Sequence, residues 1–141
     1  MNENLEIFSL EGKTAVITGG AGVLGSAIAQ GLGKAGAKIA LCDIVNSDKD
    51  VKRLQEQGIT AKGYYINVMD IEKIKVCRDE VIKDFGKVDI LLNAAGGNTK
   101  GATTSEELKF FDLPFPALEK VVGLNLFGGA ILLPRFLERI W

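Results

Sequence analysis

Short apolar runs and longer amphipathic stretches alternate along the chain. The apolar runs are rich in β-branched residues and end at glycine or a polar residue, as buried strands do. They lie at 14–18, 38–44, 59–68 and 88–93. The stretches between them have apolar residues at helical spacing and lie at 21–36, 48–58 and 70–86. This alternation predicts an α/β fold with one parallel sheet covered by helices.

The three predicted helices differ in how clearly their inward faces are marked. The first has Leu24, Ile28, Leu32 and Ala35 at helical spacing. In the second, Val51 and Leu54 are predicted to face the core. The third has Asp70 as its predicted N-cap and an apolar stripe formed by Ile71, Ile74, Val81, Ile82 and Phe85.

The pattern changes after Gly97. Residues 98–116 show no clear period, and we expect a long loop there, of a length that is often functional. Its end, "FFDLPFP", either lines a substrate pocket or caps the core. Residues 117–141 are predicted to form one long helix whose centre is apolar nearly all round, so a second surface should cover it. Pro134 is expected to kink its later part.

Composition and charge exclude several function classes. The 141 residues carry a net charge of -1, which gives no electrostatic case for nucleic acid or an anionic membrane. No apolar run is long enough for a signal peptide core or a membrane span. Cys42 and Cys77 lack CxxC spacing and the chain has no His, so we expect no metal site and a reduced, cytoplasmic protein.

The stretch "TGGAGVLG" at 18–25 is the strongest candidate for chemistry. It places Gly20-x-Gly22-x-x-Gly25 between a predicted strand and a predicted helix. Glycines there let the backbone approach a pyrophosphate, and the helix N-terminus offers free N–H groups. Asp43, at the end of the next strand, suits a ribose diol and repels a 2′-phosphate, which favours NAD(H) over NADP(H). The alternative is a turn whose glycines serve packing only.

These residues also resemble those of a known family, the classical short-chain dehydrogenases/reductases. Thr18, Gly19 and Gly25 match its TGxxxGxG motif, and Val23 stands where the family usually has another glycine. The segment "NAAG" at 93–96 is similar to the family's NNAG motif. The segment "LNLFG" at 124–128 resembles the one that carries the family's catalytic Asn.

The resemblance implies a fold, a cofactor site and one catalytic residue. It implies a Rossmann-like sheet of order 3-2-1-4 and a single, incomplete NAD-binding domain over residues 1–141, which ends after the long helix. Asn125 would be the catalytic Asn, and Asp89 a structural residue. The cofactor-binding residues would be Gly19, Gly22, Val23, Leu24, Asp43, Ile44, Asn67, Val68, Asn93, Ala95 and Gly96.

Within the family, the chain looks most like the D-mannonate oxidoreductase-like branch. The segments "GGAGVLG", "NAAGGNTKGATTSEELKFFDL" and "LNLFGGAILLP" carry this likeness. It implies a small sugar acid as substrate, of the mannonate/fructuronate type. The family's use of the long helix as a dimer face, together with an open fourth strand, leads us to expect a homodimer or homotetramer.

The family's Ser, Tyr and Lys have no counterparts in this sequence. Its tyrosines are Tyr64 and Tyr65, and the residues four positions later are Val68 and Met69. A Tyr needs a nearby cation to act as a base at neutral pH, so we expect residues 1–141 alone to be catalytically inert. Three hypotheses stay open: part of an NAD-dependent oxidoreductase, a nucleotide-binding or assembly module, or a product without a selected function.

Overall fold

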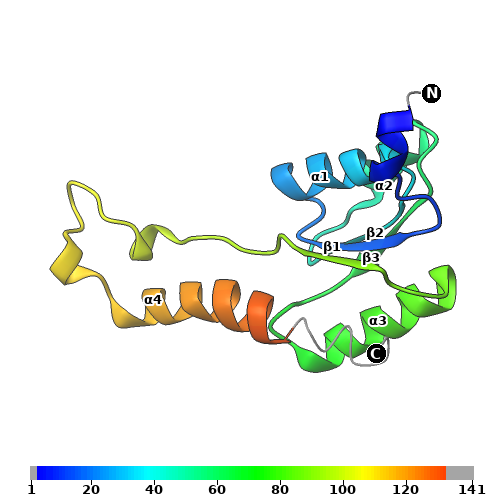
Figure 1. The fold of residues 1–141 in the computed structure, drawn as a ribbon. Coiled ribbons are helices and arrows are strands. Elements are labelled where there is room, and N and C mark those ends of the chain that lie inside the picture. Colours follow the sequence, from blue (N-terminus) through cyan, green and yellow to red (C-terminus); the bar gives the residue numbers. More distant parts are fainter. Residues whose placement is uncertain (1–2, 133–141) are drawn as a thin grey trace.

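The computed structural model describes residues 3–132 and contains one four-stranded parallel sheet (Figure 1). Its strands are β1 (Thr14–Thr18), β2 (Lys38–Asp43), β3 (Ala61–Tyr65) and β4 (Ile90–Asn93). They pair in the order β3-β2-β1-β4, which confirms the predicted topology. Within the described residues β4 pairs only with β1, so it is an edge strand.

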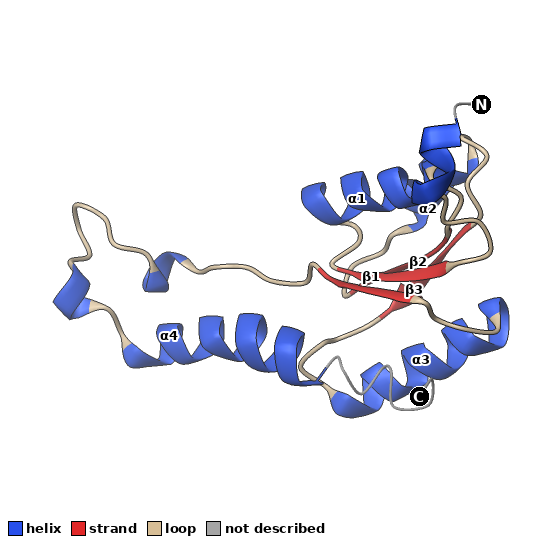
Figure 2. Ribbon diagram, in the orientation of Figure 1, coloured by secondary structure: helices blue, strands red, loops and turns tan. Residues whose placement is uncertain are grey.

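Helices cover both faces of this sheet. A 3-10 turn, η1 (Glu3–Phe8), precedes β1, and the helices that follow the strands are α1 (Val23–Lys34), α2 (Asp48–Gln55) and α3 (Ile71–Phe85). Figure 2 shows α1 and α2 on one side of the sheet and α3 on the other. The strands therefore bury both faces, as parallel strands in such layers do.

Alternate residues of the central strands belong to two separate hydrophobic clusters, one on each face of the sheet. Ala15, Ile17, Ile39 and Leu41 belong to the cluster beneath α1 and α2, which includes Ala29 and Leu54. The other cluster, on the α3 side, contains Val16, Ala40, Cys42, Tyr64, Ile66, Val68, Ile74, Cys77, Val81 and Val88. Cys42 is thus a packing residue of the core.

Two of the three helices follow the sequence prediction closely. In α2, Leu54 is buried and Val51 packs against the core. The N-cap of α3 is Asp70, whose carboxylate accepts hydrogen bonds from the N–H groups of Glu72 and Lys73. The apolar spacing of α1 was right for Leu32, which packs against the core, and wrong for Leu24, which is 75% exposed, while Gly25 and Ala29 are the buried residues. Small residues face inward because α1 packs close to the sheet.

Beyond β4 the chain forms an arm that extends away from the sheet and returns as a helix toward α3 (Figure 1). The outgoing segment has two 3-10 turns, η2 (Lys100–Ala102) and η3 (Phe110–Asp112). The returning helix begins at Phe115, two residues earlier than predicted, because Pro116 is tolerated in a first turn. It is α-helical over α4 (Phe115–Val122) and π-helical over η4 (Gly123–Leu132).

The predicted kink at Pro134 lies outside the described residues. The change to π-helical geometry at Gly123 was not predicted. Among the described helices, none has the length and apolar character needed to cross a membrane.

Candidate nucleotide-binding site

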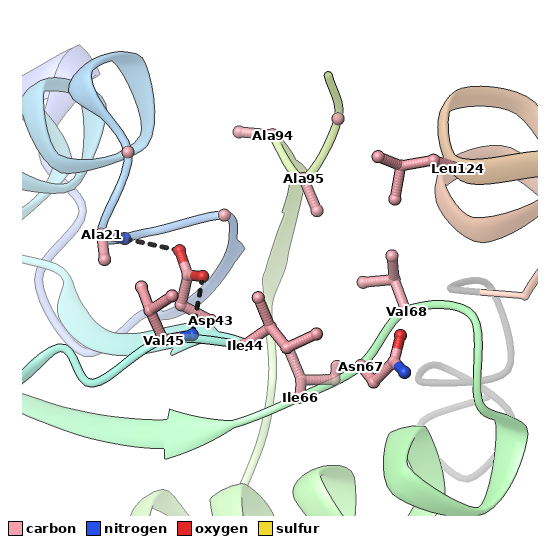
Figure 3. Close-up of a pocket in the computed structure, with 13 residues that line it drawn as sticks. Ala21, Asp43, Ile44, Val45, Ile66, Asn67, Val68, Ala94, Ala95 and Leu124 are labelled. Carbon is pink, nitrogen blue, oxygen red and sulfur yellow. Dashed lines mark hydrogen bonds between the residues drawn. The ribbon is translucent and has the colours of Figure 1, made fainter. Parts of the chain in front are cut away.

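A cavity of about 360 Å³ lies at the carboxyl ends of the strands (Figure 3). Its walls come from the glycine turn after β1, from the residues that follow β2, β3 and β4, and from η4. Residues singled out from the sequence that line it are Gly19, Gly22, Asp43, Ile44, Asn67, Val68, Ala95 and Gly96. Lining residues that the sequence did not reveal are Ala21, Val45, Ile66, Ala94 and Leu124.

The glycine turn is built so that side chains are excluded from it. Gly19 has a φ of 64°, in the left-handed region, and an added Cβ would lie 2.7 Å from the carbonyl oxygen of Ala94. A Cβ on Gly25 would collide with the carbonyl oxygen of Gly19. The turn is fixed by hydrogen bonds from Gly20 N to Cys42 O and from Gly22 N to Gly19 O. These glycines hold the start of α1 tightly against the sheet.

The first turn of α1 faces the cavity side of the molecule with no side-chain cap. Gly22 is the N-cap residue and supplies no capping hydrogen bond. Backbone N–H groups at such a helix start form an anion site, reinforced by the helix dipole. Val23 and Leu24, both predicted to contact the cofactor, are 88% and 75% exposed here and do not line the cavity.

Asp43 is held in place by two backbone groups. Its Oδ2 accepts from the N–H of Ala21 at 2.9 Å and its Oδ1 from the N–H of Val45 at 3.2 Å. The residue is only 9% exposed, and its carboxylate lies on the cavity wall (Figure 3). A fixed carboxylate there accepts hydrogen bonds from a diol and repels a phosphate.

The wall facing Asp43 is mostly apolar. Figure 3 shows Val68 and Leu124 side by side across the cavity from the glycine turn. Asn67, beside them, accepts a hydrogen bond from the N–H of Met69 through its Oδ1 and so shapes the turn that follows β3. An apolar wall opposite a few fixed polar groups is the usual composition of a small-molecule site.

The other two candidate asparagines, Asn93 and Asn125, both form hydrogen bonds with backbone atoms. Asn125 in η4 donates through Nδ2 to Gly97 O at 2.7 Å and to Val121 O at 2.8 Å, and its Oδ1 accepts from Gly97 N at 3.2 Å. Asn93, at the end of β4, does not line the cavity but donates to Gly129 O at 3.1 Å. Thr18 joins β1 to the segment that follows β4, because its Oγ1 accepts a hydrogen bond from the N–H of Ala95.

Tyr64 and Tyr65 lie away from this cavity, on β3. Tyr64 is buried and donates its hydroxyl to Asp84 Oδ2 at 2.7 Å. Burial raises the pKa of Tyr64 most, and the hydrogen bond to Asp84 raises it further. The phenolate, which is the basic form, is therefore scarce at neutral pH. Tyr65 is 55% exposed, so only Tyr64 packs in the core. Within residues 3–132 no group of three His, Cys, Asp or Glu residues is arranged to hold a metal.

Comparison with known proteins decides the family. A sequence model of the short chain dehydrogenase family matches residues 13–139. The chain belongs to the short chain dehydrogenase family. An uncharacterized oxidoreductase of Haemophilus influenzae is 41% identical to this chain over an alignment of 135 residues, and the match covers 87% of this chain and 47% of the relative. The chain thus spans about half the length of the curated relatives it matches.

Solved structures of family members share this fold. A proposed D-mannonate oxidoreductase from Haemophilus influenza, crystallised with bound NAD, is 37% identical with a TM-score of 0.88, over 98% of this chain and 53% of that one. The NADPH-dependent 3-quinuclidinone reductase from Rhodotorula rubra is 29% identical with a TM-score of 0.81, over 99% of this chain and 51% of that one. Short chain dehydrogenases similar to this chain therefore include both NAD- and NADPH-associated proteins.

Proposed function

We propose that this chain is the dinucleotide-binding part of an NAD-dependent oxidoreductase. The observation that carries the proposal is the placement of the Asp43 carboxylate on the cavity wall, beside a glycine-rich turn at the start of α1. The turn and helix N-terminus suit the pyrophosphate, and Asp43 suits the diol of the adenosine ribose. Gly19 and Gly25 allow the backbone of the turn to pack closely against neighbouring backbone, which fixes where the first turn of α1 begins.

The same carboxylate argues for NAD(H) over NADP(H). A 2′-phosphate on the ribose would bring a second negative charge against Asp43, which is nearly buried and poorly screened. The NAD bound to the Haemophilus structure supports this assignment. Of the proposed cofactor contacts, Val23, Leu24 and Asn93 have the least support, because they do not line the cavity.

For the substrate we propose a small sugar acid or related polyol. The support is the likeness, at 37% identity, to the proposed D-mannonate oxidoreductase. The nicotinamide, when bound, supplies the hydride chemistry, while Asn125 holds the backbone at Gly97 beside the site. Because the 141 residues contain no Tyr-x-x-x-Lys, we propose that they bind nucleotide without turnover.

Self-association is part of the proposal. The arm exposes a set of large apolar side chains: Phe110, Phe111, Phe115, Leu118, Val122, Leu126 and Phe127. Exposed apolar area of this extent, next to an edge strand, favours association. We expect a homodimer or homotetramer in sedimentation velocity, and a monomer at micromolar concentration would contradict this part.

Calorimetric titration tests the cofactor assignment. Wild type should bind NAD⁺ and show weaker binding or none with NADP⁺. Asp43→Asn should weaken NAD⁺ binding about 10- to 100-fold, because hydrogen bonds to a charged group contribute about 1.5–3 kcal/mol. Asp112→Asn, the same change on the exposed η3 turn, is the matched control and should leave binding unchanged. No heat from wild type, or equal binding by Asp43→Asn, would contradict the proposal.

A further inference from the structure

The end of β4 and the helix η4 are joined by two asparagine side chains that run in opposite directions. Asn125 reaches from η4 to Gly97, in the segment after β4. Asn93 reaches from the last position of β4 to the carbonyl oxygen of Gly129 in η4, at 3.1 Å. Asn93 is thus hydrogen-bonded to the helix, whereas the residues that follow it in the chain, Ala94 to Gly96, line the cavity.

The carbonyl of Gly129 lacks one of the backbone donors that a regular π-helix provides. In a π-helix the carbonyl of residue i accepts from the N–H of residue i+5. For Gly129 that residue is Pro134, which has no backbone N–H. The π-helical segment ends at Leu132, and Gly129 is a buried residue. A buried carbonyl without a partner is costly, and the amide of Asn93 supplies the donor.

The stretch of η4 at Gly128 and Gly129 packs against residues that form the wall of the cavity. A Cβ added to Gly128 would lie 3.0 Å from Val68 Cγ2 and 3.1 Å from Met69 Sδ, so the helix packs closely on the turn after β3. Val68 and Leu124 form the wall opposite Asp43. The position of this wall therefore depends on how firmly η4 is held at Gly128 and Gly129.

We propose that Asn93 is a positioning residue that completes the hydrogen bonding of Gly129 and thereby fixes η4 as one wall of the nucleotide cavity. Its contact is with the helix, and any effect on nucleotide binding passes through Val68 and Leu124. The effect on the helix is independent of any ligand. The effect on binding rests on the proposed function.

Hydrogen exchange measured in the full 141-residue chain tests the helix contact. Asn93→Asp keeps the shape of the side chain and removes the donor, so at neutral pH the amides of η4 should exchange about 5- to 30-fold faster. As the pH falls through the ordinary range of an Asp carboxyl, from about 6 to about 3, the introduced carboxyl gains a proton and can donate to Gly129 O, so the difference should shrink. Exchange rates are compared after correction for intrinsic rates.

Three controls separate this effect from general damage. Asn98→Asp makes the same change in the loop, where the side chain bonds only to Thr99 and Thr103, and should leave η4 unaltered. Amides of β1 and β2 report whether the core is intact. If Asn93→Asp does not fold, Asn93→Ala gives the same comparison without a charge.

The outcomes are distinct. Faster exchange in η4 with a protected sheet and recovery at low pH would support the proposal. Exchange in η4 within about twofold of wild type, or an equal effect from Asn98→Asp, would overturn it. Calorimetry with NAD⁺ at neutral pH should show binding weakened in Asn93→Asp and unchanged in Asn98→Asp. Altered exchange in a protein whose wild type binds no NAD⁺ would overturn the proposed function and leave the helix contact standing.

Discussion

Replacing Gly19 with alanine tests the steric argument for the turn. The new Cβ would lie 2.7 Å from both the carbonyl oxygen of Ala94 and the nitrogen of Ala95. Both are backbone atoms and cannot move aside as a flexible side chain would. In addition, the φ of 64° at Gly19 is unfavourable for any residue with a Cβ.

Gly12→Ala provides a matched control. Gly12 has a φ of 73°, but an added Cβ there would meet nothing within 4 Å. Gly12→Ala should therefore cost only the conformational term of about 1–2 kcal/mol. Gly19→Ala should cost that term plus about 1–3 kcal/mol for the clash, or about 2–5 kcal/mol in all. The reduced entropy of the unfolded chain is common to both variants and cancels.

Urea unfolding followed by circular dichroism measures this difference. The free energy of unfolding of Gly19→Ala should lie about 1–3 kcal/mol below that of Gly12→Ala, with similar m-values. A difference below about 0.5 kcal/mol would refute the reasoning, because it would mean that the segment after β4 is not held against the turn.

Three further predictions concern titrating side chains. A hydrogen bond from the N–H of Thr14 lowers the pKa of Asp89, so its carboxylate stabilises the fold at neutral pH and loses this effect as the pH falls. Asp89→Ala should therefore lower the free energy of unfolding by about 1–2 kcal/mol near pH 7 and by less below about pH 4. An equal loss of unfolding free energy at the two pH values would contradict this. Cys42 and Cys77 are fully buried with sulfurs 3.7 Å apart, and their hydrogen bond and burial raise the pKa of Cys42. Both thiols should resist a disulfide reagent until urea unfolds the chain, and rapid labelling of the native state would disprove it. Burial and the hydrogen bond to Asp84 raise the pKa of Tyr64, so Tyr64 should stay un-ionised in a spectrophotometric titration to about pH 12 for as long as the chain stays folded.

Most of the fold could be predicted because local pattern and tertiary packing agree. The runs that became β1 and β2 are apolar between their polar end residues, and every residue of the two strands except Lys38 is buried. Asp70 and Gly86 mark the ends of α3 with ordinary cap chemistry. The third strand is shorter than the 59–68 run because its pairing with β2 covers only Ala61–Tyr65.

What the sequence did not reveal depends on contacts between distant segments. The inward face of α1 is set by close packing on the sheet, which selects Gly25 and Ala29 over the larger Leu24. Leu124 reaches the cavity only because the arm returns past the end of β3. The lack of an N–H at Pro134 was the one available sign that Gly129 would need another donor.

Nuclear magnetic resonance with NAD⁺ tests the central claim, that the cavity at the carboxyl ends of the strands binds a dinucleotide. Backbone amide shifts should change along the glycine turn, at Asp43 and Val45, and at Asn67 and Val68, all of which line or adjoin the cavity. Amides of the outer part of α3, far from the cavity, should not change. Saturable shifts confined to this set would support the account, whereas no shifts at millimolar NAD⁺, or shifts centred elsewhere, would contradict it.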